Sequence, residues 1–120
     1  MGQTDILTLK GKFTACQKML TVFGDEVRQR LLLLMLEGDP NGVRVADISD
    51  KMKLTPPAVS HHMQILKDAG VVHCRKEGKN MYYFLDSSGK DIDKLLELFA
   101  QMKDARAPLS RFPTVKKEQE

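Results

Sequence analysis

The first part of the chain carries apolar residues at three- and four-residue spacing. Between residues 6 and 23 these positions form one stripe: Leu9, Phe13, Cys16, Leu20 and Phe23. Such spacing predicts an amphipathic helix that buries one face. Gly24 interrupts the pattern, and Asp25 has the short oxygen-bearing side chain favoured at the start of a following helix.

The second predicted helix is apolar on every side, because residues 31–36 read LLLLML. A helix that is apolar all round is typical of a protein core, so we expect this one to be central and buried. Gly38 is suited to end it. A short third helix is then indicated by Val45, Ile48 and Met52.

Only a tight turn, residues 53–55, separates the third helix from a fourth. Thr55 is a good N-cap, and Pro56 suits the first helical position, where its missing N–H costs nothing. We expect this helix to reach about Ala69 and to end at Gly70. Its core-facing residues are predicted to be Val59, Met63 and Leu66. Its exposed face is predicted to carry Pro57, Ala58, Ser60, His61 and Gln64.

Residues 71–76 and 81–85 are rich in β-branched and aromatic side chains, and residues 77–80 (EGKN) suit the turn of a hairpin. A last helix is expected to open at Ser87 and Ser88. Its apolar stripe is Ile92, Leu95, Leu96, Phe99 and Met102. The chain is therefore expected to be mainly α with a small β-hairpin, as one domain over residues 1–104, with a polar, flexible tail over 105–120. A helix, tight turn, helix and basic hairpin in succession indicate a winged helix-turn-helix, which places one helix in the DNA major groove.

Composition agrees with a globular domain, since 42% of the 120 residues are apolar and 29% are charged. No apolar run approaches the ~20 residues needed to span a bilayer, and the first residues show no secretion signal, so we expect a cytoplasmic protein without membrane association. The net charge of +3 is unevenly distributed. Residues 55–79 hold four basic and two acidic side chains, whereas residues 86–104 hold three basic and five acidic ones. Positive charge therefore lies in the predicted DNA-reading segment.

The same segments resemble the ArsR/SmtB family of winged-helix repressors over roughly residues 10–104. The matching pieces are GDEVR at 24–28, VSHHM at 59–63, LKDAGVV at 66–72 and RKEGK at 75–79, followed by Tyr82 and Tyr83. The resemblance implies a homodimer joined through the first and last helices. It also implies binding to an inverted-repeat operator and release by an inducer.

Short and amide-bearing groups near the start of a helix suit close approach to base edges and phosphates. The candidate DNA-binding residues are Thr55, Pro57, Ala58, Ser60, His61 and Gln64 in the fourth helix and Arg75, Lys76 and Lys79 in the wing. Gln64 can read adenine bidentately, and Ser60 can contact base or phosphate. Arg75 and Lys79 are the first choices for phosphate or minor-groove contact. The alternative is an ordinary solvated helix face and hairpin.

The first and last helices carry more apolar surface than a small chain readily covers, which favours pairing with a second copy. The candidate interface residues are Phe13, Cys16, Leu20, Leu95, Leu98, Phe99 and Met102. The alternative is packing within one chain.

Metal sensing, common among the proteins that this chain resembles, is not expected here. The third helix lacks paired cysteines and the last helix lacks histidine, so the usual thiolate and carboxylate–histidine sites have no ligands. His61, His62 and His73 all lie in or beside the DNA-reading segment. We therefore expect neither a metal nor another cofactor.

The two cysteines leave a thiol switch open as a second sensing mode. Cys74 is followed by Arg75 and Lys76, whose charge favours a thiolate, while Cys16 lies on the apolar stripe of the first helix. The alternative is that both are buried small hydrophobic residues, which is common for free cysteine.

The sequence thus favours a dimeric, sequence-specific DNA-binding regulator that acts as a repressor and is released by a small effector. A winged helix used for protein–protein contact is the alternative. An enzyme is not expected, because no nucleophile has a motif-based partner and no phosphate-cradling glycine loop is present.

Overall fold

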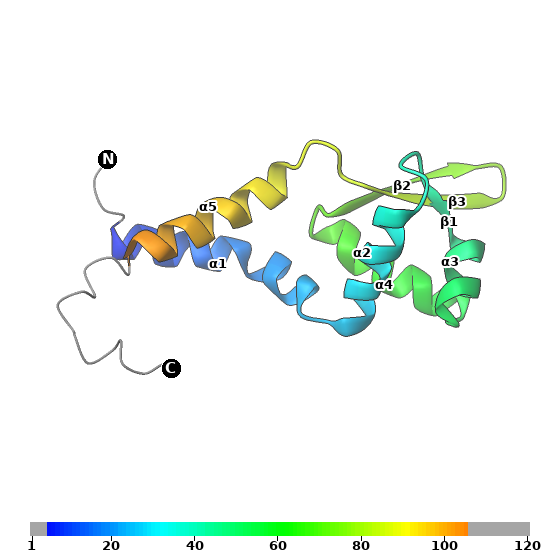
Figure 1. The fold of residues 1–120 in the computed structure, drawn as a ribbon, viewed down its shortest axis with the longest axis horizontal. Coiled ribbons are helices and arrows are strands. Elements are labelled where there is room, and N and C mark those ends of the chain that lie inside the picture. The colour runs from blue at the N-terminus through cyan, green and yellow to red at the C-terminus, as the bar shows by residue number, and fades with distance from the viewer. Residues whose placement is uncertain (1–4, 106–120) are drawn as a thin grey trace. The chain divides into compact units, whose positions relative to one another are not determined.

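The computed structural model describes residues 5–105. Their contacts form two compact units, one joining residues up to Cys16 with those from Asp93 onward, the other comprising Gln17–Ile92. The elements are α1 (Ile6–Phe23), α2 (Glu26–Glu37), β1 (Val43–Arg44), α3 (Val45–Met52), α4 (Pro56–Asp68), β2 (Val72–Glu77), β3 (Asn80–Leu85) and α5 (Lys90–Ala105) (Figure 1). The predicted five helices and β-hairpin are confirmed.

The second unit packs α2, α3 and α4 against one another beside a small antiparallel sheet. Apolar side chains from every layer are fully buried there: Leu31, Ile48, Val59, Met63, Leu66 and Val72. Full burial of one such side chain contributes about 1.5–3 kcal/mol. This core fixes α4 with its predicted apolar face inward, which leaves its opposite face free.

The sheet has three strands in the order β1-β3-β2, so the expectation of a hairpin alone was incomplete. In β1, Val43 pairs with Tyr83 and Arg44 pairs with Tyr82. A two-residue strand is too short to show an alternating pattern. It forms because the loop after α2 runs beside an edge of β3 that would otherwise have unpaired backbone groups.

The expectation that α2 is buried on every side was wrong. Leu31 and Met35 are buried, but Leu33 is 58% exposed and Leu36 is 68% exposed. The elements packed most closely against α2 are α3, α4 and β3, and they leave Leu33 and Leu36 uncovered. Leu33 lines an open groove of about 930 Å³, together with Leu34, Met52 and Tyr82. Leu36 lines a smaller hollow of about 290 Å³.

Helix ends in the second unit follow their predicted chemistry. The Asp25 carboxylate accepts a hydrogen bond from the backbone N–H of Arg28 at 3.0 Å, and Gly38 ends α2. The last helix, α5, begins at Lys90, directly after the predicted serines, and Ser88 Oγ accepts from the backbone N–H of Lys90 at 3.2 Å. Local side-chain acceptors therefore set where these helices start.

In the first unit, the beginning of α1 and most of α5 lie side by side (Figure 1). The Lys12 ammonium lies 3.3 Å from the Glu97 carboxylate, and the Cys16 thiol donates to the carbonyl of Lys94 at 3.9 Å. Ala105, predicted to begin the tail, is the last residue of α5. The rest of that tail lies outside the described residues. No helix within residues 5–105 is long and apolar enough to cross a membrane.

Candidate nucleic-acid interface

The turn between α3 and α4 is closed by hydrogen bonds of Ser49. Its hydroxyl donates to the carbonyl of Leu54, whose own N–H donates to the carbonyl of Ser49 at 3.1 Å. Lys53 adopts the left-handed conformation, φ 59° and ψ 40°, which ends α3 abruptly. The two helices therefore meet across a tight corner, the geometry of a helix-turn-helix.

Helix α4 starts as the sequence predicts. Thr55 Oγ1 accepts from the backbone N–H of Ala58 at 3.3 Å, and Pro56 occupies the first helical position. The predicted DNA-facing residues Thr55, Pro57, Ser60, His61 and Gln64 are exposed, and Ala58 is half-buried. The start of α4 therefore presents small and polar side chains to solvent, a surface suited to close approach to phosphates and base edges.

The amide of Gln64 is engaged within the helix, since its Nε2 donates to the Asp68 carboxylate at 2.8 Å. This contact points the amide toward the C-terminal end of α4, away from the start of the helix. His61 is exposed and its ring lies edge-on to that of His62, with centroids 5.6 Å apart. His62 is half-buried.

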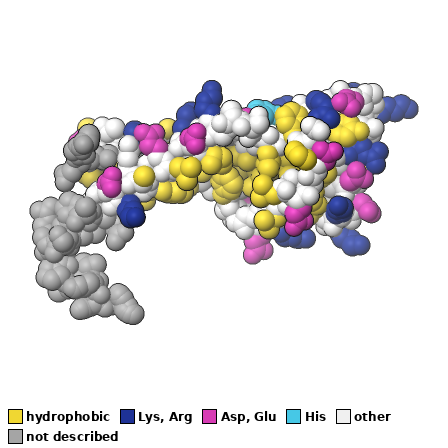
Figure 2. All heavy atoms as spheres, turned by 45° about the horizontal axis from the view of Figure 1, so that its top comes forward, with side chains coloured by type: hydrophobic (Ala, Val, Ile, Leu, Met, Phe, Trp, Pro, Cys, Tyr) yellow, Lys and Arg dark blue, Asp and Glu magenta, His cyan; other side chains and the backbone are white. Residues whose placement is uncertain are grey.

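The wing consists of β2 and β3, joined by a two-residue turn at Gly78 and Lys79. Gly78 has φ 62°, a conformation that favours glycine at the first position of such a turn. Lys76 and Lys79 are exposed. Figure 2 shows Lys and Arg side chains (dark blue) interspersed with Asp and Glu side chains (magenta) over the unit that contains the hairpin. The wing and the start of α4 thus belong to the same unit and supply basic and polar groups respectively.

Arg75, a first choice for phosphate contact, makes hydrogen bonds to other residues of the chain. Its Nε donates to Glu77 Oε2 at 2.7 Å, and its Nη1 donates to the carbonyl of Asn41. Its guanidinium carbon lies 5.0 Å from the ring centre of Tyr82. Arg75 therefore ties the wing to the loop before β1, and its predicted DNA contact stays a prediction.

A second polar cluster lies where the wing leads into α5. His73 Nε2 is 2.7 Å from Asp86 Oδ1, while Asp86 Oδ2 accepts from Ser88 Oγ at 2.7 Å and from the N–H of Gly89 at 3.0 Å. The hydrogen bonds from Ser88 and His73 hold the pKa of Asp86 below its ordinary value. The Asp86 carboxylate thus links the segment between β3 and α5 to β2 through its contact with His73.

The remaining candidate chemistry is as follows. Both cysteines are free thiols, with Cys16 buried and Cys74 half-buried in β2. In the described part of the chain no three His, Cys, Asp or Glu side chains are grouped so as to hold a metal ion.

The predicted interface residues of α1 and α5 separate into two classes. Cys16, Leu95 and Leu98 are buried within the single chain, and Leu20 is half-buried, so packing inside the chain accounts for them. Phe13, Phe99 and Met102 remain exposed. Ile6, Leu7 and Leu96, which were not on the predicted interface, add further exposed apolar surface to the same unit.

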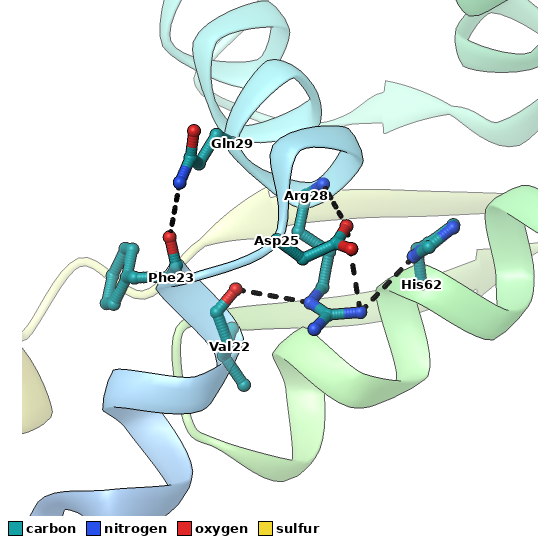
Figure 3. A network of polar contacts seen from close by, with 6 residues as sticks. All are labelled: Val22, Phe23, Asp25, Arg28, Gln29 and His62. Atoms are coloured by element: carbon teal, nitrogen blue, oxygen red, sulfur yellow. Dashed lines mark hydrogen bonds and ion pairs between the residues drawn. The ribbon is translucent and has the colours of Figure 1, made fainter.

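Sequence reasoning missed Arg28. Its side chain is 11% exposed and lies against His62 on α4, with Nη1 3.4 Å from His62 Nδ1 (Figure 3). Burial lowers the pKa of His62. The only signal in the sequence was the piece GDEVR, which showed a helix start but not what the arginine contacts.

Comparison with known proteins agrees with this geometry. A sequence profile described as "Bacterial regulatory protein, arsR family" matches residues 25–73. An uncharacterized HTH-type transcriptional regulator of Methanocaldococcus jannaschii is 39% identical over 87 residues, covering 72% of this chain and 96% of that protein. The transcriptional repressor SdpR of Bacillus subtilis is 33% identical over 64 residues, covering 53% of this chain and 68% of the repressor.

Among solved structures, a homodimeric winged helix-turn-helix DNA-binding domain from Mycobacterium bovis, described as a possible ArsR-family transcriptional regulator, is similar in fold. The alignment covers 89% of this chain and 93% of that domain, with 24% sequence identity and a TM-score of 0.56.

Proposed function

Because the chain belongs to the ArsR family of helix-turn-helix transcriptional regulators, we propose that it is a homodimeric repressor that binds an inverted-repeat operator and is released by an effector. The observation that carries this proposal is the free face of α4 beside the basic wing. Its core face is fully buried through Val59, Met63 and Leu66, so the side chains opposite are held outward by packing.

Each part of this surface has a role in the proposal. The start of α4 enters the major groove, where Ser60 and His61 meet base edges and Thr55, Pro57 and Ala58 approach the backbone. Gln64 joins them when its amide exchanges the Asp68 carboxylate for a base. Lys76 and Lys79 contact phosphates, whose neutralisation releases counterions. Arg75 contributes mainly by linking the wing to the loop before β1 through hydrogen bonds from Nε and Nη1. A phosphate would be contacted by the guanidinium N–H groups that these bonds leave unused.

The exposed apolar side chains of α1 and α5 support the dimer. Phe13, Phe99 and Met102 belong to a unit in which two helices lie side by side. Two copies that pair through this surface would place two α4 helices on one operator, whose half-sites would repeat the symmetry of the protein. The homodimeric Mycobacterium bovis domain supports the same arrangement.

Release requires an effector that binds the DNA-competent and DNA-incompetent geometries with different affinity. The groove beside α2 offers space for a small molecule. Its lining includes apolar Leu33 and Met52 and charged groups of both signs, among them Arg30, Lys51 and Glu37. An effector there would contact both α2 and α3. Helix α3 directly precedes α4, the recognition helix, which is the helix proposed to enter the major groove.

The test is selection of bound sequences from a random duplex-DNA pool at near-physiological salt. We expect enrichment of an inverted repeat by the native protein. Ser60→Glu, which adds a negative charge on the free face of α4, should abolish enrichment. The matched control Ser87→Glu adds the same charge at an exposed serine between β3 and α5 and should retain it. A folded native protein that enriches no sequence would contradict the proposal and favour a winged helix used for protein–protein contact.

A further inference from the structure

Arg28 connects the end of α1 and the start of α2 with His62 on α4, which lies 34 residues further along the chain (Figure 3). Its Nε donates to the carbonyl of Val22, in the last turn of α1, at 3.2 Å. Its Nη1 lies 3.4 Å from His62 Nδ1 on α4 and 3.9 Å from the carboxylate of Asp25, the N-cap of α2. One nearly buried guanidinium thus contacts the end of α1, the start of α2 and the side of the recognition helix.

The unpaired carbonyl groups at the end of α1 explain the position of the Arg28 side chain. The last carbonyls of a helix have no partner within it, and they carry partial negative charge. Gln29 Nε2 donates to the carbonyl of Phe23 at 2.6 Å, just as Arg28 donates to that of Val22. The first turn of α2 therefore supplies the missing donors of α1, and this fixes the position of the Arg28 side chain.

The contact with His62 constrains the state of its ring. A guanidinium has five N–H donors and no acceptor, so His62 Nδ1 must be the acceptor. An imidazole that accepts at Nδ1 carries its single proton on Nε2 and is neutral. Protonation of Nδ1 would place an N–H donor against the N–H donors of Arg28.

Several groups act on this ring. Burial lowers the pKa of His62, and the neighbouring charges of Arg28 and His61 lower it further, whereas the Asp25 carboxylate raises it. Arg28 thus opposes the charged form of His62 while Asp25 favours it. Without the Arg28 charge, the Asp25 carboxylate would act on His62 with less opposition, so the pKa of His62 would rise.

We propose that Arg28 is a positioning residue: it fixes the position of the recognition helix, α4, by donating a hydrogen bond to neutral His62. Protonation of His62 breaks this hydrogen bond and frees α4 to shift. This inference rests on the proposed DNA-binding function. His62 lies on the core side of α4, next to His61 on its free face. A shift of α4 at His62 would therefore displace the side chains proposed to read the bases, where small misplacements are costly.

The first test needs no DNA. Long-range ¹H–¹⁵N NMR of the histidine rings in the native protein should show His62 neutral with its proton on Nε2, titrating below the ordinary imidazole range. Arg28→Gln should raise the pKa of His62, because it removes the repulsion and leaves Asp25. A proton on Nδ1 at neutral pH, or no change of the His62 pKa in Arg28→Gln, would overturn the proposal.

The second test measures the ratio of operator to non-operator affinity for the selected duplex at constant salt. As the pH falls through the pKa of His62 found in the first test, the native protein should lose roughly tenfold in this ratio, as expected for loss of one hydrogen bond to a charged group. His62→Asn keeps an acceptor near the Nδ1 position but cannot be protonated, so its ratio should decline less than that of the native protein, and any decline that remains belongs to exposed His61. The control His73→Asn, in β2, should retain the native decline.

A ratio in His62→Asn that declines as in the native protein would overturn the proposed release. An unchanged ratio in folded Arg28→Gln at neutral pH would overturn the positioning role. If the native protein binds no duplex, the proposed function fails, while the ring titration still decides whether Arg28 holds neutral His62.

Discussion

The carboxylate of Asp91 occupies the space beside Gly70 in which a Cβ atom would lie. An ideal Cβ on Gly70 would be 1.9 Å from Asp91 Oδ2. Gly70 also has φ 82°, in the left-handed region that favours glycine. The turn that ends the recognition helix is thus in direct contact with the first turn of α5, and only glycine suits both the conformation and the space.

Gly70→Ala should destabilise the protein through two effects. The left-handed conformation costs a residue with a Cβ about 1–2 kcal/mol, and the displaced Asp91 adds to this. Gly78→Ala is the matched control, since Gly78 has φ 62° but no atom within 4 Å of its ideal Cβ. Urea denaturation should show a larger loss for Gly70→Ala; equal losses would mean that the contact with Asp91 has no energetic consequence.

Thr55→Ala should lower the free energy of unfolding by about 1 kcal/mol, because Thr55 Oγ1 caps the N-terminus of α4. Thr55→Ser keeps the hydroxyl and should remain close to the native stability. Chemical denaturation of the three proteins measures the difference. The cap would be unimportant if the serine and alanine variants unfolded at the same denaturant concentration.

Asp86 should make stability depend on acid pH. Hydrogen bonds from Ser88 and His73 lower its folded-state pKa from 3.8, so its stabilising contribution is complete above the unfolded-state pKa and is lost as pH falls through the folded-state pKa. Asp86→Asn should therefore be less stable than the native protein at neutral pH, with the difference shrinking in strong acid. Thermal unfolding across pH measures this. The control Asp50→Asn, an exposed aspartate on α3, should retain the native pH dependence.

The wing lysines should set the salt dependence of DNA binding. Each lost phosphate contact lowers the slope of log affinity against log salt by about 0.9, so the double variant Lys76→Ala, Lys79→Ala should lower it by up to about two units. The double variant Lys90→Ala, Lys103→Ala removes the same charge from exposed positions on α5. Fluorescence anisotropy at several salt concentrations measures the slopes. Equal reductions in both double variants would show a general charge effect rather than contacts of the wing.

The exposed apolar face of α5 should control the oligomeric state. Phe99 is 48% exposed, and a charge there would be buried without a partner if this face pairs with a second copy. We expect Phe99→Glu to be monomeric by analytical ultracentrifugation at concentrations where the native protein is dimeric. Ala100→Glu changes the neighbouring exposed residue and should remain dimeric. A dimer that persists in Phe99→Glu would place the interface elsewhere.

The sequence by itself determined the helices, their caps and the wing. Thr55, Pro56 and Asp25 act on the backbone within three residues of their own position, so their effects can be read locally. The spacing of Val59, Met63 and Leu66 fixed the buried face of α4, and hence the free face on which the proposed function depends.

Tertiary structure decided which candidate side chains are free. Leu33 is exposed because α2 has neighbours on only part of its surface, whereas Leu98, a candidate for the dimer interface, is buried in the single chain. Arg75 is bound to the loop before β1, and Arg28 is aimed at His62, each across 34 residues of sequence. Residue type and spacing describe the local backbone, whereas contacts of this range depend on how distant segments pack, which periodicity does not encode.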